Sequence, residues 1–527
     1  MIRRVLPTMI LVSLLASCGS FHKSLLNKKQ TTSLFEMMIS DIEFYDAEMI
    51  ETRDNTKEVS WEEYKAYHEK FWSKSVSPEE LKKLFYKFKR GYLNGHSHLV
   101  FIHPTEKKNQ TYSDRESTIK LGYSYPEISF YNLENRKKIV SINNKPIEDI
   151  YWNFSNYETS KVRSNAVLKT FGTYFNQGYL RIDGEAPYLI HYEDQKADSV
   201  VYIPTEYPDE DIFFDGINLV GYEDWKIIEK GYKVALLKKN DVALIKIKNF
   251  IYMNGFGGDM DCSGAIEEIP DSTMCKDVKV LIMGLQSIKD QTNFLIFDLQ
   301  DNPGGNENTP FVKMFCPGPF SDTRVQYRKT ELLEDPEIRD ALSYFTPNAE
   351  NWYNSIHENG MYEQVEYGDF LPVRGDFCRG DDTCGLTPIS PSNDLTSKFD
   401  KIIILTNDGT GSSADDFTFR FKEYGGVFVA GQPQSADLTY SLISVLYYID
   451  VHGKLDRVFY GNAQQKPDVS GTELFKIDIP YCKTLDSDGK ILQGNPLPMD
   501  LLVPITPDNF VNIKRDVLDR AIENYCK

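Results

Sequence analysis

Two stretches of the chain join a strand-length apolar run to a glycine-rich turn. The first run, residues 294–298, leads into Asn302-Pro-Gly-Gly305, and the second run, residues 401–406, leads into Asn-Asp-Gly-Thr-Gly. Helical spacing follows the second turn at once. The pattern predicts two buried strands, and it places Ser412 where the second strand gives way to the first turn of a helix.

The start of a helix suits a nucleophilic serine, because unpaired N–H groups and the helix dipole favour negative charge there. A serine attacks a carbonyl when a base removes its proton and when preorganised donors hold the oxyanion. Ser412 is therefore the expected nucleophile. The expected oxyanion contacts come from Gly304, Gly305 and Ser413. The simpler alternative is that Ser412 and Asp415 form a loose capping box and that Pro-Gly-Gly is only a turn.

The apolar pattern changes along the rest of the chain. Residues 33–92 have helical spacing, with helix starts predicted at Ser60 and Ser77 from their capping patterns. Residues 138–150 have the pattern of a hairpin with an Asn-Asn turn. From Asp241 onward strands and helices alternate, which predicts an α/β layer architecture.

The two turn motifs resemble those of the tail-specific or C-terminal-processing serine peptidases and their tricorn-like relatives. In that family a strand ending D-L-R-x-N-x-G-G supplies oxyanion donors, and a later strand leads into T-x-S-x-S-E, whose first serine is the nucleophile. Residues 298–305 are similar to the first motif, with Gln300 for the usual arginine, and residues 410–415 to the second. The resemblance implies a crotonase/ClpP-like layered catalytic domain that needs no cofactor. Residues 138–150 also resemble part of a PDZ domain.

The lysine-dyad branch of the family does not fit this chain. Its lysine lies in a G-E-x-x-x-G-K-G turn, which aligns with residues 431–438. No lysine occurs between Lys422 and Lys454. A Ser-Lys dyad is therefore not expected.

The tricorn-like branch takes its base from a D-x-H-[ST] motif, which residues 94–97 (Asn-Gly-His-Ser) resemble. His96 is the expected base, since a histidine with an ordinary pKa of about 6.5 is partly neutral at working pH and can accept a serine proton. The resemblance gives Ser97 the role of orienting it. The acidic residue of this relay aligns near Gln493, so the orienting carboxylate stays unassigned.

Three histidines near this motif allow a different interpretation. His96, His98 and His103 form an H-x-H-x4-H string that invites a metal. On a strand, His96 and His98 share a face while His103 points the other way, so three-ligand geometry requires a bend. Histidines that line a strand are the more ordinary explanation, and no metal is expected.

The N-terminus has the pattern of a lipoprotein signal. Arg3 and Arg4 precede an apolar stretch, residues 5–15, that is too short to span a bilayer. Small residues then lead to Cys18 in a segment that resembles a bacterial lipobox, and several acyl chains on Cys18 would anchor the chain stably. The prediction is a lipid-anchored protein of the bacterial cell envelope, on the periplasmic side or the outer surface. An ordinary cleaved secretory signal is the alternative.

Export to an oxidising compartment makes the other seven cysteines informative. Because their number is odd, at least one of them stays unpaired or pairs outside the chain. Two pairs that are close in the sequence are candidate disulfides, each closing a short loop: Cys262 with Cys275, and Cys378 with Cys384. Spacing alone leaves the connectivity open.

Composition narrows the set of partners. The 527 residues carry a formal net charge of −19, which disfavours nucleic acid because phosphate binding needs a basic surface. An anionic membrane would also repel an acidic body, so attachment would rest on the lipid and a polar tether. The expected partners are a peptide or unfolded protein substrate and, through the lipid, a membrane. The oligomeric state stays open.

The whole pattern predicts an α/β protein with several domains. The resemblance implies a serine endopeptidase that cleaves unfolded or C-terminal protein segments through an acyl-enzyme. The alternative is a lipoprotein of the same fold that binds a peptide or other ligand without catalysis, because several positions depart from the family pattern: Asn94, Gln300, Asp437 and Gln493. The expected segments are a signal peptide (1–17), a tether (18–32), an N-terminal helical domain with the histidine-bearing strand (33–112), a PDZ-like β-rich region (113–235) and a catalytic domain (236–527) whose insert (306–400) forms a lid or substrate wall.

Overall fold

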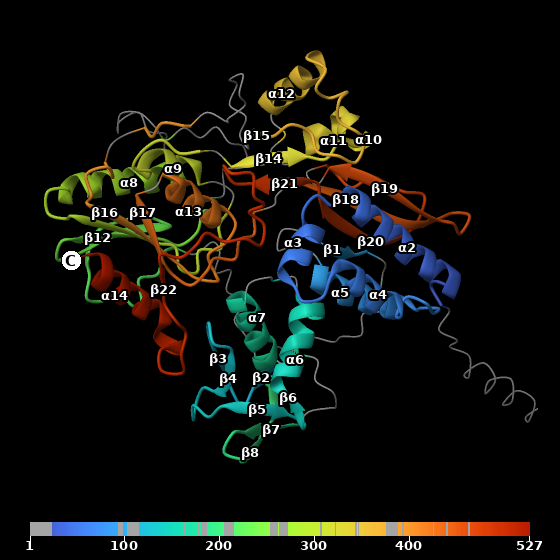
Figure 1. Ribbon diagram of the computed structural model, residues 1–527, viewed down its shortest axis with the longest axis horizontal. Helices are drawn as coiled ribbons and strands as arrows, with labels where there is room; N and C mark the ends of the chain where they lie inside the picture. The colour runs from blue at the N-terminus through green and yellow to red at the C-terminus, as the bar shows by residue number, and fades with distance from the viewer. Residues whose placement is uncertain are drawn as a thin grey trace, which may run out of the picture.

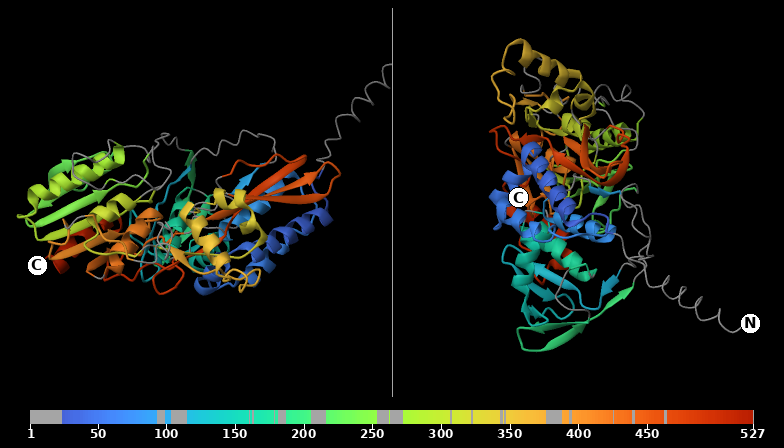
Figure 2. Two further views of the ribbon diagram at one scale, coloured as in Figure 1. Left: turned by 90° about the horizontal axis from the view of Figure 1, so that it is seen from above. Right: turned by 90° about the vertical axis from the view of Figure 1, so that its right-hand side faces the viewer.

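The computed structural model describes most of the chain and confirms the α/β class. The described residues are 24–92, 99–102, 115–159, 161, 164–177, 179–180, 187–204, 216–252, 262, 272–305, 308–321, 323–342, 345, 347–375, 388–392, 395–424, 426–438, 441–461 and 464–526. Figure 1 shows three parts: a large sheet with helices on both faces, a set of N-terminal helices on a second sheet, and a small domain below them. Figure 2 shows that the first two parts lie side by side along the long axis.

The large sheet has seven strands in the order β10-β11-β12-β13-β16-β17-β22. Strands β10 to β12 are antiparallel neighbours, and the pairs from β12 to β22 are parallel. Because β13 and β16 are parallel neighbours, their carboxyl ends meet at one edge of the sheet, and both predicted motif strands are present there. The strands are β10 (Lys226–Lys230), β11 (Val234–Lys239), β12 (Val242–Ile247), β13 (Phe294–Asp298), β16 (Lys401–Thr406), β17 (Val427–Gly431) and β22 (Leu501–Leu502).

Helices cover both faces of this sheet (Figure 1). Leu295 and Phe297 of β13 face α8 (Thr273–Ile288), α9 (Thr309–Phe315) and α13 (Ser413–Glu423). Phe294 and Ile296 alternate with them and face α14 (Ile513–Tyr525). A strand buried on both faces needs apolar side chains at every position, which explains the unbroken apolar runs in the sequence.

The N-terminal helices share one core with distant parts of the chain. They pack with residues 325–371 and with a sheet of order β1-β20-β18-β19. Helices begin after Ser60 and Ser77 as predicted, and both serines form capping boxes, with Glu63 and Glu80 as partners. The elements are α2 (Lys28–Tyr45), α3 (Met49–Thr56), α4 (Trp61–Glu69), α5 (Pro78–Tyr92), β1 (Leu99–Phe101), β18 (Leu442–Asp450), β19 (Leu455–Gly461) and β20 (Gly471–Pro480).

The insert, which was expected to be a lid or substrate wall, contributes side chains to that core. Side chains such as Leu333 and Tyr353 are buried in it, so the middle of the insert packs against the N-terminal helices instead of lying over an open cleft. A three-stranded sheet of order β15-β14-β21 connects the insert to the C-terminal region. The elements are β14 (Arg324–Tyr327), α10 (Glu331–Glu334), α11 (Pro336–Ala341), α12 (Pro347–Glu358), β15 (Arg374–Gly375) and β21 (Cys482–Leu485).

The small domain has its own apolar core. The predicted hairpin is present, with Asn143 and Asn144 at φ of 48° and 61° in its turn, as a two-residue turn of this kind requires. The described elements are β2 (Arg115–Ser117), β3 (Leu121–Ser124), β4 (Ser129–Asn132), β5 (Ile139–Ile142), β6 (Lys145–Pro146), α6 (Ile147–Asn153), η1 (Phe154–Glu158), α7 (Ser164–Asn176), β7 (Tyr188–Tyr192), β8 (Ala197–Val200) and β9 (Tyr202–Pro204).

Within the described ranges, no helix has both the length and the apolar character needed to cross a membrane. The predicted signal segment and Cys18 lie outside those ranges.

Candidate active site

The two motif turns meet at the carboxyl ends of β13 and β16. Hydrogen bonds join them directly: the Gly411 N–H donates to the Asn302 carbonyl oxygen at 3.0 Å, and the Thr410 hydroxyl donates to the Leu299 carbonyl oxygen at 2.8 Å. Asn302 also donates through its side chain to the Ile247 carbonyl oxygen of β12 at 3.2 Å. Asn302 and Thr410 thus fasten segments that are about a hundred residues apart in the sequence.

Gly304 allows the two turns to touch. Its φ is +89°, and a Cβ at this position would lie 2.5 Å from the Gly411 carbonyl oxygen and 2.6 Å from the Ser412 Cβ. Only glycine fits such an approach in this conformation. The Ser413 hydroxyl donates to the carbonyl oxygen of Gly305 at 2.7 Å, which holds the second glycine against the start of α13.

Ser412 does not have the geometry of a helix cap. Its φ of 53° and ψ of −126° are strained for a residue with a side chain, and it forms no side-chain capping bond to α13. The Asp415 carboxylate accepts from the Ser435 hydroxyl and the Asp437 N–H instead. The capping-box alternative is therefore wrong. A strained serine between a strand and a helix is the arrangement that exposes nucleophiles in other hydrolases.

The N–H groups near Ser412 differ in their availability. The Gly304 N–H donates to Asn302 Oδ1 at 2.9 Å, so it is already used within its own turn. The N–H groups of Gly305 and Ser413 donate no hydrogen bond to any part of the chain that the structure describes. Those two donors flank the Ser412 turn, and backbone N–H groups of this kind can hold an oxyanion.

Several predicted site residues lie outside the described ranges. They are His96, Ser97, His98 and His103, together with Cys18, Cys378 and Cys384. Cys262 and Cys275 are joined by a disulfide with a Cα–Cα distance of 5.3 Å, as proposed from their spacing. In the ranges that the structure covers, no cluster of three or more His, Cys, Asp or Glu side chains is suited to a metal ion.

A charged cluster beside Ser412 was not anticipated from the sequence. Asp437 Oδ2 lies 2.7 Å from the Lys161 ammonium, and Asp437 Oδ1 accepts from the Gln493 side-chain amide at 3.0 Å. The Asp437 N–H donates to Asp415 at 3.1 Å. Burial, and then the charge of Asp437, hold the pKa of the Asp415 carboxyl well above its usual value. Lys161 is 276 residues from Asp437 along the chain, so no local pattern could have indicated this pair.

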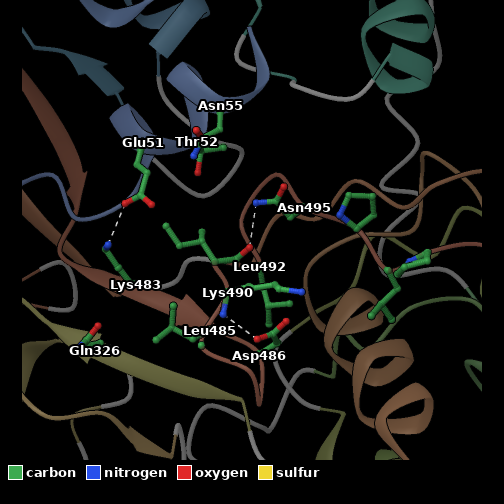
Figure 3. A pocket seen from close by; sticks show the side chains of 15 residues that line it. Glu51, Thr52, Asn55, Gln326, Lys483, Leu485, Asp486, Lys490, Leu492 and Asn495 are labelled. Atoms are coloured by element: carbon green, nitrogen blue, oxygen red, sulfur yellow. Dashed lines mark hydrogen bonds and ion pairs between the residues drawn. The ribbon is translucent and has the colours of Figure 1, made fainter. Parts of the chain in front are cut away.

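A cavity of about 620 Å³ is lined in part by Leu492 and Asn495, which flank Gln493 in the sequence. Figure 3 shows it between Thr52 and Asn55 of α3 and the side chains of Leu492 and Asn495. The Thr52 hydroxyl donates to the Gln493 carbonyl oxygen at 3.3 Å. One loop therefore forms a wall of the cavity and supports the charged cluster beside Ser412.

Comparisons with known proteins agree with this arrangement. The model of peptidase family S41 matches residues 241–446, which include both motif turns. Mature CPAF is similar over 94% of this chain and 96% of its own, with 13% identity and a TM-score of 0.56. Mature CPAF complexed with lactacystin is similar over 94% and 98%, with 12% identity and a TM-score of 0.56. At such identities these two likenesses concern the fold alone.

No curated protein sequence matches the chain. The matched residues include the strained serine and the glycine turns. Residues 241–446 therefore match peptidase family S41, and this match supports a serine peptidase that acts on proteins.

Proposed function

We propose that this serine peptidase is an endopeptidase of the bacterial cell envelope that cleaves unfolded or C-terminal protein segments through an acyl-enzyme on Ser412. The observation that carries the proposal is the contact between the two turns. Gly304 packs directly against a serine held at φ 53° at the start of α13. A hydroxyl at such a junction lies close to backbone donors that suit a developing negative charge.

In the proposed reaction, the Ser412 Oγ attacks the carbonyl carbon of the scissile peptide while His96 accepts its proton. The N–H groups of Gly305 and Ser413 hold the oxyanion. The C–N bond then breaks, the proton passes from the imidazolium to the leaving amine, and water hydrolyses the acyl-enzyme by the same route. Gly304 does not act as a donor, since its N–H already donates to Asn302 Oδ1. It contributes because it has no Cβ, which lets the backbone lie close to the Ser412 turn. Ser97 orients His96 in this scheme.

The finer architectural assignments follow from the family resemblance. The large sheet with helices on both faces serves as a crotonase/ClpP-like catalytic domain, and the small domain serves as a PDZ-like unit that engages substrate. Lipid on Cys18 holds the enzyme at the membrane. No nucleic acid partner, metal or other cofactor is required by this scheme.

Labelling with a fluorophosphonate tests the nucleophile, because an activated serine reacts and a capping serine does not. We expect Ser412→Ala to abolish labelling and hydrolysis of a denatured protein while the protein stays folded. Ser272→Ala is the matched control. Ser272 caps α8 by accepting from the Cys275 N–H at 3.1 Å, so its loss costs about 1 kcal/mol of stability and leaves labelling intact. Equal labelling of Ser412→Ala and wild type would refute the nucleophile. No labelling of either would favour the binding protein without catalysis.

A further inference from the structure

The Asp437 carboxylate is held on both of its oxygens. Lys161 contacts Oδ2 at 2.7 Å and Gln493 donates to Oδ1 at 3.0 Å. The side chain of Asp437 is 15% exposed and that of Lys161 is 33% exposed, so the ion pair is partly shielded from water. A partly buried ion pair with hydrogen bonds to its remaining oxygen defines a geometry more strictly than an exposed one.

The loop that carries Asp437 lies directly behind the nucleophile turn. The Ser435 N–H donates to the Thr410 carbonyl oxygen at 2.9 Å. The Ser435 hydroxyl is 2.6 Å from the position that a Cβ on Gly411 would occupy, and it donates to Asp415 on the first turn of α13 at 3.2 Å. A shift of this loop would therefore move the residues on both sides of Ser412.

Asp415 makes this support sensitive to the position of Asp437. It is 3% exposed, its Oδ1 has no hydrogen-bond partner among the described residues, and its Oδ2 accepts from the Ser435 hydroxyl and the Asp437 N–H. A buried carboxyl with so few partners cannot easily form replacement bonds. If Asp437 moved away, Asp415 would lose the hydrogen bond from the Asp437 N–H, and no other group would replace it.

Lys161 belongs to the small domain, between η1 and α7. The Lys57 ammonium donates to the carbonyl oxygens of Lys161 and Ser155. The backbone of Lys161 is therefore bound to the residue that directly follows α3. Next to it, the Asn165 side chain donates to the Pro433 carbonyl oxygen at 2.7 Å. The same short segment therefore contacts the loop behind Ser412 twice.

We propose that Lys161 is a positioning residue: by locking Asp437, it lets the small domain hold the 432–438 loop against the Ser412 turn. This inference rests on the proposed function, in which Ser412 is the nucleophile. Lys161 does not act as the base, since its ammonium is committed to Asp437. A displacement of the turn by about 1 Å would lower turnover by about 10²-fold. Because Lys161 acts on the nucleophile and not on the substrate, kcat falls and KM stays near the wild-type value.

The test measures kcat and KM for a peptide substrate and the rate of fluorophosphonate labelling in Lys161→Met, Asp437→Asn and the double variant. We expect kcat and labelling to fall about 10–100-fold in each single variant. The double variant should be no worse than either single one, because the same interaction is lost. Lys161→Arg should restore most of the activity, since it keeps the charge.

Arg136→Ala is the matched control. Arg136 also joins the small domain to the catalytic half, through Asp508 at 2.6 Å, but it contacts a different loop. Its loss should leave kcat unchanged. If Arg136→Ala and Lys161→Met lower kcat equally, domain attachment in general is responsible and the inference is wrong. Wild-type kcat in Lys161→Met would also overturn it.

Hydrogen exchange separates this inference from the proposed function. The backbone N–H groups of residues 408–420 and 431–438 should exchange faster in Lys161→Met than in wild type, whether or not the protein has activity. Faster exchange in a protein that a fluorophosphonate does not label would support the positioning role and refute the nucleophile. Unchanged exchange in a protein that is labelled would refute the positioning role and support the nucleophile.

Discussion

Replacement of Gly304 by alanine tests whether contact between the two turns controls the proposed reactivity of Ser412. A Cβ at Gly304 would lie 2.5 Å from the Gly411 carbonyl oxygen, 2.6 Å from the Ser412 Cβ and 2.6 Å from the Ser413 backbone nitrogen. These distances are about 1 Å shorter than ordinary van der Waals contact. Two of the three atoms belong to the backbone, so the nucleophile turn itself would have to move.

The magnitude has two parts. An alanine at φ +89° costs about 1–2 kcal/mol for the left-handed conformation alone. Overpacking against the neighbouring turn adds about 1–3 kcal/mol, so the free energy of unfolding should fall by about 2–5 kcal/mol. A displacement of Ser412 approaching 1 Å should lower turnover by about 10²-fold, which corresponds to about 2.7 kcal/mol in the activation barrier.

Gly453→Ala separates these two parts. Gly453 has a similar φ of +81°, but nothing lies within 4 Å of the position of its Cβ. This variant should lose about 1–2 kcal/mol of stability and keep full labelling of Ser412. The assay is the rate of fluorophosphonate labelling at a temperature where both variants are folded, together with urea unfolding. If Gly304→Ala is labelled at the rate of Gly453→Ala, the two turns do not control the nucleophile and the reasoning fails.

Two further predictions concern stability. Burial, followed by the charges of Lys87 and Arg53, lowers the pKa of His68 to about 3. Between pH 6.5 and this value, the unfolded state binds a proton at His68 and the folded state does not. The free energy of unfolding therefore decreases as the pH is lowered through this range, by up to about 1.4 kcal/mol per pH unit. Asp46 acts with the opposite sign, because burial raises its pKa to about 6. The control is therefore His68→Phe, in which the other titrating groups are kept. From pH 6.5 to 4.5, the free energy of urea unfolding should decrease by about 2–3 kcal/mol more in wild type than in this variant. Equal decreases in the two proteins would contradict the low pKa of His68. Reduction of the Cys262–Cys275 disulfide, which spans 13 residues, should cost about 3 kcal/mol; an unchanged urea midpoint after reduction would show that the bridge contributes little to folding.

Much of the local structure could be predicted from the sequence because its causes lie within a few residues of each other. The apolar runs of β13 and β16 indicate strands that are covered on both faces. The Ser60 capping box and the Asn143-Asn144 turn involve neighbouring side chains and backbone angles. The same is true of the motif turns, where glycine and serine chemistry alone pointed to Ser412.

Other features arise only where segments far apart in the sequence meet. Gly304 is one of the expected oxyanion contacts, and its N–H donates to Asn302 Oδ1. The sequence motif cannot show which of several N–H groups a nearby side chain will use. The insert was expected to be a lid or substrate wall, and the sequence did not indicate that its apolar side chains are buried with the N-terminal helices. The burial of those side chains depends on packing partners contributed by other parts of the chain.

The clearest case is the pair formed by Lys161 and Asp437. In the sequence each is one charged residue among many, and nothing in its neighbours indicates a partner 276 residues away. The pair forms because the small domain packs beside the carboxyl ends of the large sheet, where Asp437 already lies next to Asp415. Local chemistry therefore indicated Ser412 as the candidate nucleophile, together with its turn. The groups that hold this turn in place depend on how the domains pack, since an ion pair forms only where folding brings opposite charges together.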